Sequence, residues 1–141
     1  MTQINAYLTF SGNCREAMSF YKDCIGGELT LQTAGESPMA ATMPDEMKEF
    51  ILHAALVKDN MMLMATDCVG PDGLVKGNAV SLCINCSNEN EIKKLYNKLS
   101  ADGTATHPLQ HTFWGAIFGG LTDKYGNHWL LNYNNETKQQ L

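Results

Sequence analysis

Two stretches of this chain, 75 positions apart, carry the same helical pattern of apolar residues. In residues 12–29, GNCREAMSFYKDCIGGEL, and residues 87–104, SNENEIKKLYNKLSADGT, apolar side chains recur at the spacing i, i+3, i+4, i+7 of an amphipathic helix. The first set is Ala17, Phe20, Tyr21 and Cys24, and the second is Ile92, Leu95, Tyr96 and Leu99. One offset superimposes all four pairs, so the sequence predicts two halves of the same build within one structural domain.

Each predicted helix has matching signals at its ends. The N-terminal cap candidates are Ser11 and Asn13 in the first helix and Ser87 and Asn88 in the second. The C-terminal candidates are Gly26, Gly27 and Gly103, which suit the left-handed conformation that ends many helices. The repeat therefore covers the helix ends as well as the phase of the apolar stripe.

Strand-like stretches flank both helices in the same order. One precedes each helix (residues 4–10 and 80–86), and three follow it (28–34, 50–59 and 60–67, then 103–110, 112–123 and 127–134). We therefore predict an α+β fold of two tandem βαβββ modules, residues 1–67 and 78–134, with a glycine-rich linker at 68–77 and a polar tail at 135–141. Each module can bury one sheet face under its own helix, and the other faces are expected to form a half-barrel around a shared cavity.

The charge balance and hydropathy argue against two classes of partner. The net charge is −5 and the ten basic residues are scattered, whereas binding to a nucleic-acid backbone needs clustered Lys and Arg. No apolar run approaches the roughly 20 residues of a membrane-spanning helix. The first residues, MTQIN, do not resemble a signal peptide, so we expect a cytoplasmic protein.

The cysteines fit the same expectation. There are five, an odd number, mostly in apolar surroundings, as in a reducing compartment with buried thiols. Cys83 and Cys86 form a C-x-x-C match, but they lie in the alternating run AVSLCINC, which predicts a strand. Residues three apart on a strand point to opposite faces, so this pair is not expected to bind zinc or form a redox couple.

The motifs YLTFSGNCREAMSFYKDCIGGEL, LHAALVKDNMMLMATD, GNAVSLCI and TFWGAIFGGLTDKYGNHW resemble the glyoxalase/bleomycin-resistance/extradiol-dioxygenase superfamily, also called vicinal oxygen chelate proteins. Within it the chain is most similar to the PhnB-like branch, which carries the label 3-demethylubiquinone methyltransferase-like. A methyl-donor site would usually need a glycine-rich turn from a strand into a helix. The glycines of IGG (residues 25–27) end a helix instead, so methyl transfer is not expected.

The resemblance implies four metal-ligand positions, from the first and last strands of each half, usually filled by His, Glu or Gln. Aligned by strand register, these positions hold Asn5, Met64, Ser81 and Leu130 here. A borderline or hard divalent cation prefers imidazole or carboxylate ligands, which these residues do not supply. We therefore expect no metal and no other cofactor, although His53 and His128 leave a displaced site open.

Strand alternation supplies the remaining candidates for a ligand site. The residues expected to line a cavity are Asn5, Tyr7, His53, Met64, Ser81, Trp114, His128 and Leu130, with Phe118 as an alternative aromatic wall to Trp114. Such a mixture of apolar walls and a few neutral polar groups is typical of small-molecule sites. His107 and His111 are expected at the surface, and Asp67 is expected to form a turn.

Two functions of different classes follow. The first is a metal-independent protein that binds a small, partly planar organic molecule. The second is a divalent-metal-dependent lyase, isomerase or dioxygenase with atypical ligands, so whether the protein is an enzyme stays open, and no catalytic residue is assigned. The resemblance also implies a homodimer.

Overall fold

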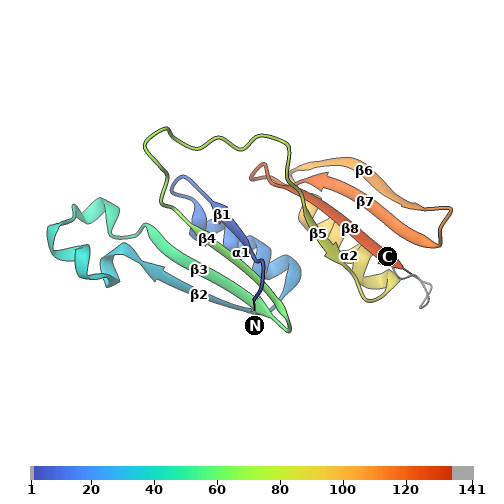
Figure 1. Ribbon diagram of the computed structural model, residues 1–141, viewed down its shortest axis with the longest axis horizontal. Coiled ribbons are helices and arrows are strands. Elements are labelled where there is room, and N and C mark those ends of the chain that lie inside the picture. The colour runs from blue at the N-terminus through green and yellow to red at the C-terminus, as the bar shows by residue number, and fades with distance from the viewer. Residues whose placement is uncertain (1, 135–141) are drawn as a thin grey trace. The chain divides into compact units, whose positions relative to one another are not determined.

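The computed structural model describes residues 2–134, and the polar tail expected at 135–141 lies outside the described residues. The described chain falls into two compact units, divided between Val75 and Lys76 (Figure 1). The chain from residue 67 to residue 81, which connects the units, contains no helix or strand. None of the described helices is long and apolar enough to cross a membrane.

Both units have the predicted order of one strand, one helix and three strands. The first consists of β1 (Ala6–Thr9), α1 (Cys14–Ile25), β2 (Glu28–Thr33), β3 (Ile51–Lys58) and β4 (Met61–Thr66). The second consists of β5 (Leu82–Asn85), α2 (Glu89–Ser100), β6 (Thr104–His111), β7 (Ala116–Thr122) and β8 (His128–Asn134). The expectation of two βαβββ modules in an α+β fold is therefore confirmed.

The two sheets repeat each other's topology. Their strand orders are β1-β4-β3-β2 and β5-β8-β7-β6, and in each the first strand pairs in parallel with the last. The other pairings are antiparallel. Each helix packs on one face of its own sheet, mainly against β3 in the first module and against β7 and β8 in the second. The opposite face of each sheet, which we call the open face, is not covered by the helix of its module (Figure 1).

The helix faces were predicted fully in one module and partly in the other. In α2 all four predicted positions, Ile92, Leu95, Tyr96 and Leu99, are buried. In α1, Ala17 and Tyr21 are buried, but Phe20 and Cys24 are only half-buried, because Cys14, Met18 and Ile25 turn toward the sheet instead. Seven of the twelve residues of α1 are apolar, more than one i, i+3, i+4, i+7 stripe contains, so their spacing alone did not decide which stripe packs inward.

The helix ends differ from prediction in two places. Asn88 caps α2 by accepting a hydrogen bond from the Glu91 N–H, but Asn13 makes no side-chain cap for α1. After α2, the left-handed residue is Asp102 (φ 60°), and Gly103 is needed for a different reason. A Cβ at Gly103 would lie 2.3 Å from the carbonyl oxygen of Thr122, so only glycine allows β6 to start this close to the end of β7.

Three short 3-10 helices lie between β2 and β3, where the sequence has a proline-containing insertion. They are η1 (Ala34–Glu36), η2 (Pro38–Thr42) and η3 (Asp45–Met47). The Glu36 carboxylate accepts hydrogen bonds from the N–H and hydroxyl of Thr33, both at 2.9 Å, and these bonds lower the pKa of Glu36.

Candidate ligand-binding faces

The open face of the first sheet brings together residues from three strands. Tyr7 on β1 pairs in register with Met64 on β4, and Met64 pairs with Ala55 on β3. Paired residues in neighbouring strands point to the same face, so His53, two residues before Ala55, lies on that face as well. Tyr7 is 51% exposed there, and Asn5 is exposed just before β1.

Tyr7 and His53 form the polar centre of this face. The Tyr7 hydroxyl lies 3.5 Å from His53 Nδ1, and the two rings are tilted by 46° with centroids 5.9 Å apart. A tyrosine hydroxyl can donate and accept, and a neutral imidazole offers one donor and one acceptor. The pair can therefore hydrogen-bond to a carbonyl, hydroxyl or ring nitrogen of a ligand.

Apolar side chains adjoin the pair on the same face. Met62 (39% exposed) and Val57 pair in register, and Met64 lies beside Tyr7. Thioether chains are flexible and polarisable, and they pack favourably on aromatic rings. The first open face thus combines adaptable apolar contacts with two hydrogen-bonding groups.

The open face of the second sheet carries different side chains in the same register. Cys83 on β5 pairs with Leu130 on β8. In the first module, Tyr7 occupies the position equivalent to Cys83, and Met64 the position equivalent to Leu130. The Asn132 amide donates to Asn85 Oδ1 at 3.2 Å, and Thr122 Oγ1 lies 3.0 Å from His128 Nδ1. Ser81, next to β5, is exposed.

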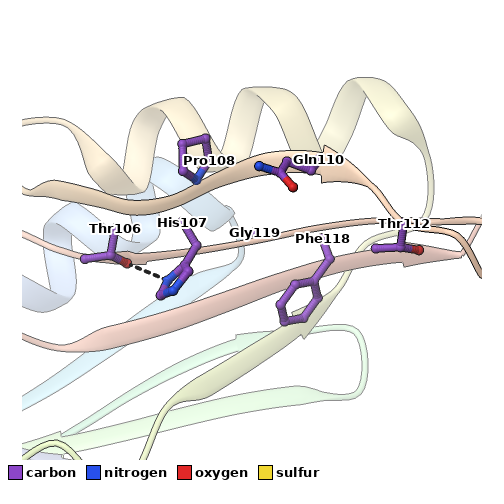
Figure 2. Close-up of a pocket in the computed structure, with 7 residues that line it drawn as sticks. All are labelled: Thr106, His107, Pro108, Gln110, Thr112, Phe118 and Gly119. Atoms are coloured by element: carbon purple, nitrogen blue, oxygen red, sulfur yellow. Dashed lines mark hydrogen bonds between the residues drawn. The ribbon is translucent and has the colours of Figure 1, made fainter.

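A pocket of about 220 Å³ opens at the outer edge of this second face (Figure 2). Its lining residues are Thr106, His107, Pro108, Gln110, Thr112, Phe118 and Gly119. His107 was expected only as a surface residue, and Gln110 was not predicted as part of a site. The available signal was Pro108 inside a predicted strand, since proline in a strand marks a bulge or an edge, where side chains are redirected.

Trp114 lies away from the sheet faces, in the turn that joins β6 to β7. It is 43% exposed and packs edge-on against Phe113, with ring centroids 4.9 Å apart. Phe118, the alternative aromatic wall, lies on the open face and lines the pocket. Within the predicted set, the structure groups Asn5, Tyr7, His53 and Met64 on one sheet and Ser81, His128 and Leu130 on the other.

Comparison with known proteins identifies the family. Residues 2–132 match the family described as 3-demethylubiquinone-9 3-methyltransferase. The chain belongs to this family. Over 139 residues it is 30% identical to protein YjdN of Escherichia coli K12, covering 92% of this chain and 93% of that protein.

Comparison with solved structures shows which fold this family shares. Protein PA1353 of Pseudomonas aeruginosa is 38% identical, with a TM-score of 0.82 over 95% of this chain and 98% of that one. A putative 3-demethylubiquinone-9 3-methyltransferase, PhnB protein, from Bacillus cereus is 28% identical, with a TM-score of 0.74 over 94% and 99%. A glyoxalase/bleomycin resistance protein/dioxygenase family enzyme of Burkholderia phytofirmans, 14% identical with a TM-score of 0.61 over 92% and 97%, shares the fold. The predicted family and fold are confirmed.

The residues of this family member do not fit the metal that its superfamily implies. At the four ligand positions, Asn5, Met64, Ser81 and Leu130 offer an amide, a thioether, a hydroxyl and an alkyl group. Within each module, the described residues bring no three His, Cys, Asp or Glu side chains together as a metal site. His53 and His128 lie on different sheets, with Tyr7 and Thr122 as their neighbours.

In residues 2–134, the turns that lead from β1 into α1 and from β5 into α2 do not form the phosphate- or nucleotide-binding nest that a dinucleotide-type cofactor site uses. At the start of α1, Asp67 Oδ1 accepts hydrogen bonds from the backbone N–H groups of Gly12 and Cys14, both at 2.9 Å. At the start of α2, the Glu91 carboxylate accepts a hydrogen bond from the Ser87 N–H at 2.6 Å, and the Glu91 N–H donates to Asn88 Oδ1. Because side chains of the chain itself already use these N–H groups, the methyltransferase label has no support in the helix starts.

The Cys83 and Cys86 thiols are not activated for nucleophilic chemistry. Cys83 is exposed on the open face and Cys86 is buried, as expected for strand residues three apart. Desolvation raises the pKa of Cys83, and burial raises the pKa of Cys86 to about 12, with further contributions from the charges of Glu91 and Cys83. Since the thiolate is the nucleophile, a raised pKa disfavours attack by either sulfur.

Proposed function

We propose that this protein binds a small, partly planar organic molecule without a metal ion. The ligand lies on the open sheet faces, and the Tyr7–His53 pair of the first module is its polar anchor. The observation that carries the proposal is this hydrogen-bonding pair, 3.5 Å apart on a solvent-facing sheet surface beside Met62 and Met64.

The side-chain chemistry of the face supports a binding site over a packing surface. A Tyr–His pair that is half-exposed does not contribute to a buried core. The methionine beside it, 39% exposed, leaves apolar area in water, which does not stabilise a surface that only faces solvent. Ligand pockets, by contrast, combine apolar walls with a few fixed polar groups. A flat ring packed on Met64 would place a carbonyl or hydroxyl substituent within reach of Tyr7 and His53.

The runner-up is a metal-dependent lyase, isomerase or dioxygenase of the same superfamily. It would need at least three good ligands in one place, whereas Asn5, Met64, Ser81 and Leu130 at the four superfamily positions supply no imidazole or carboxylate. We also propose a homodimer, on the strength of family membership, with the open faces contributing to its ligand sites.

The first test measures metal content. Protein purified without added metal is analysed for divalent ions, as wild type and as His53→Ala. We expect no stoichiometric ion in either. A stoichiometric ion that is lost in His53→Ala would overturn the proposal and favour the metal-dependent enzyme.

The second test screens uncharged aromatic compounds of one to three rings by thermal shift and titration. For a compound that binds, Tyr7→Phe and His53→Ala should each weaken binding about 2- to 10-fold, the value of one lost hydrogen bond. His111→Ala is the matched control, because His111 is an exposed histidine on β6 that forms no part of either candidate site. Equal affinities for all variants would contradict the assignment of the anchor.

A further inference from the structure

The pocket at the edge of the second sheet is formed by an irregular strand. The register of β6 against β7 shifts twice, between Thr104 and His107 and between His107 and Gln110. Pro108 lies in the second shift and has no N–H to give to the ladder. Bulges of this kind bend the strand and redirect its side chains, which here opens a hollow between β6 and β7.

The irregular strand is held in place from the helix side. The Tyr96 hydroxyl of α2 lies 2.9 Å from the carbonyl oxygen of His107 and 2.8 Å from that of Gly120, donating its proton between them. Burial raises the pKa of Tyr96, so this donor keeps its proton at physiological pH. The backbone beneath the pocket is therefore fixed by a tertiary contact.

Two adjacent glycines on β7 lie beside β6, and Gly119 is the one that lines the pocket. A Cβ at Gly119 would lie 2.9 Å from the His107 carbonyl oxygen and 2.8 Å from Leu109 Cδ2. A Cβ at Gly120 would lie 3.6 Å from His107 Nδ1. Hydrogen at Gly119 lets β6 and β7 approach closely, and hydrogen at Gly120, on the other face of β7, leaves space beside the His107 ring.

Three side chains in this pocket have unused binding capacity. The rings of His107 on β6 and Phe118 on β7 lie on the same side of the hairpin (Figure 2), and Gln110, on β6 like His107, pairs in register with Phe118. His107 Nδ1 lies 3.3 Å from Thr106 Oγ1, which leaves Nε2 available. Among the described residues, the Gln110 amide makes no hydrogen bond and the Phe118 ring has no aromatic partner.

We propose that this pocket binds a planar aromatic carboxamide or a similar uncharged ring compound, stacked on Phe118 and hydrogen-bonded through its amide to Gln110. His107 Nε2 supplies a second polar contact. Apart from His107, no lining side chain is ionisable, so the pocket holds no permanent cation to compensate the desolvation of an anionic ligand. The volume, below that of a drug-sized site, fits one or two rings.

This inference rests on the proposed function for the general class of ligand and adds a second location with its own residues. Ala55 pairs with Met64 of β4 in the first module, as Gly120 pairs with Leu130 of β8 in the second, so Ala55 and Gly120 are equivalent positions. Two residues before them, His53 in the first module therefore corresponds to Phe118 in the second. The two open faces therefore differ at their most important positions, and they can be tested separately.

The test titrates benzamide into isotope-labelled full-length protein and follows backbone amide signals by NMR. We expect shifts at residues 106–119, weaker binding of benzoate and of cyclohexanecarboxamide, and a 2- to 10-fold loss in both Gln110→Ala and Phe118→Leu. Gln110→Glu keeps the size but removes the donor, and should reduce affinity as well. His111→Ala, on the same strand and outside the pocket, should bind like wild type.

The location of the shifts separates the two proposals. Shifts confined to β1, β3 and β4 would overturn this pocket and leave the proposed function intact. Shifts at β6 and β7, lost in the Gln110 and Phe118 variants, would support the pocket whatever happens at Tyr7 and His53. No saturable shift at residues 106–119, or wild-type affinity in folded Gln110→Ala and Phe118→Leu, would overturn it.

Discussion

At the scale of single residues, Asp67 shows how a tertiary contact replaces a local signal. The sequence predicted Ser11 or Asn13 as the cap of α1 and Asp67 as a turn former. Instead Asp67 is buried, and its carboxylate accepts three backbone N–H groups, from Gly12, Cys14 and Ile51, all at 2.9 Å. It caps the helix through space and ties it to the start of β3.

Replacing Asp67 should therefore cost more than replacing the predicted cap. Asp67→Asn puts an NH₂ group where an oxygen accepts, and loses the charge that strengthens the remaining bonds. We expect a loss of about 1.5–3 kcal/mol in the free energy of unfolding, measured by urea denaturation. Asn13→Ala should change it by less than about 0.5 kcal/mol. Equal costs for both variants would refute the assignment of the cap.

The thiols should differ in reactivity according to their surroundings. Burial, with a smaller contribution from the Asp67 charge, raises the pKa of Cys14 to about 12, and the pKa of Cys86 is also about 12. Below those values both stay protonated, so raising the pH from about 7 to about 9 should not activate them. Iodoacetamide labelling followed by mass spectrometry should modify the exposed Cys68 first, and Cys14 and Cys86 only after unfolding. Labelling of Cys14 in folded protein at the rate of Cys68 would contradict this.

The same scale separates what sequence could and could not predict about the site. Tyr7, His53 and Met64 were placed on one face because strand alternation needs only the parity of positions. His107 and Gln110 were missed because two register shifts in β6 break that parity. Trp114 was grouped with Phe118 because a turn inside a continuous apolar run, TFWGAIF, leaves no break in hydropathy.

At the scale of elements, both modules have a glycine at the start of the strand that follows the helix, where the backbone lies close to a neighbouring strand. Gly27 and Gly103 each precede that strand, and a Cβ at either would collide with a backbone carbonyl oxygen, of Val57 at 2.6 Å and of Thr122 at 2.3 Å. The sequence predicted glycine at these places for its left-handed conformation. The close approach of two strands, which depends on pairs far apart in sequence, is what excludes other residues at Gly103.

Gly103→Ala should accordingly be costly for a reason unrelated to its own dihedral angles. The new methyl group would meet backbone atoms that cannot rotate away, so the start of β6 must move. We expect a loss of about 2–3 kcal/mol in the free energy of unfolding, measured by thermal or urea denaturation. Gly70→Ala is the control, since a Cβ there meets nothing within 4 Å and should be neutral. A neutral Gly103→Ala would show that the strand ends are looser than described.

At the scale of the whole molecule, the chain is two modules of one design with different open faces. The repeat in the sequence was sufficient to predict this, because helix phase, helix length and strand order recur together. The chemistry of the faces was only partly predictable. Positions equivalent in register carry Tyr7 and His53 in one module and Cys83 and Phe118 in the other.

The connection between the modules should be the first site of proteolysis. Residues 70–81 are exposed throughout and contain no helix or strand, and Lys76 is the trypsin site within them. Limited trypsin digestion should first give fragments that end at Lys76 and begin at Gly77, and Lys76→Gln should suppress that cut. A first cut at Lys48, in the segment of 3-10 helices, would contradict this.

The capping of the two helices also has a consequence for folding kinetics. The start of α2 is completed by Asn88 and Glu91, three residues apart, so this helix can nucleate from local contacts. The start of α1 is completed by Asp67, more than fifty residues later in the chain. The chain between them must close into a loop, at a cost in entropy, before the Asp67 hydrogen bonds can form. During synthesis α1 therefore leaves the ribosome well before the carboxylate that completes it, whereas the groups that complete the start of α2 lie within residues 87–91.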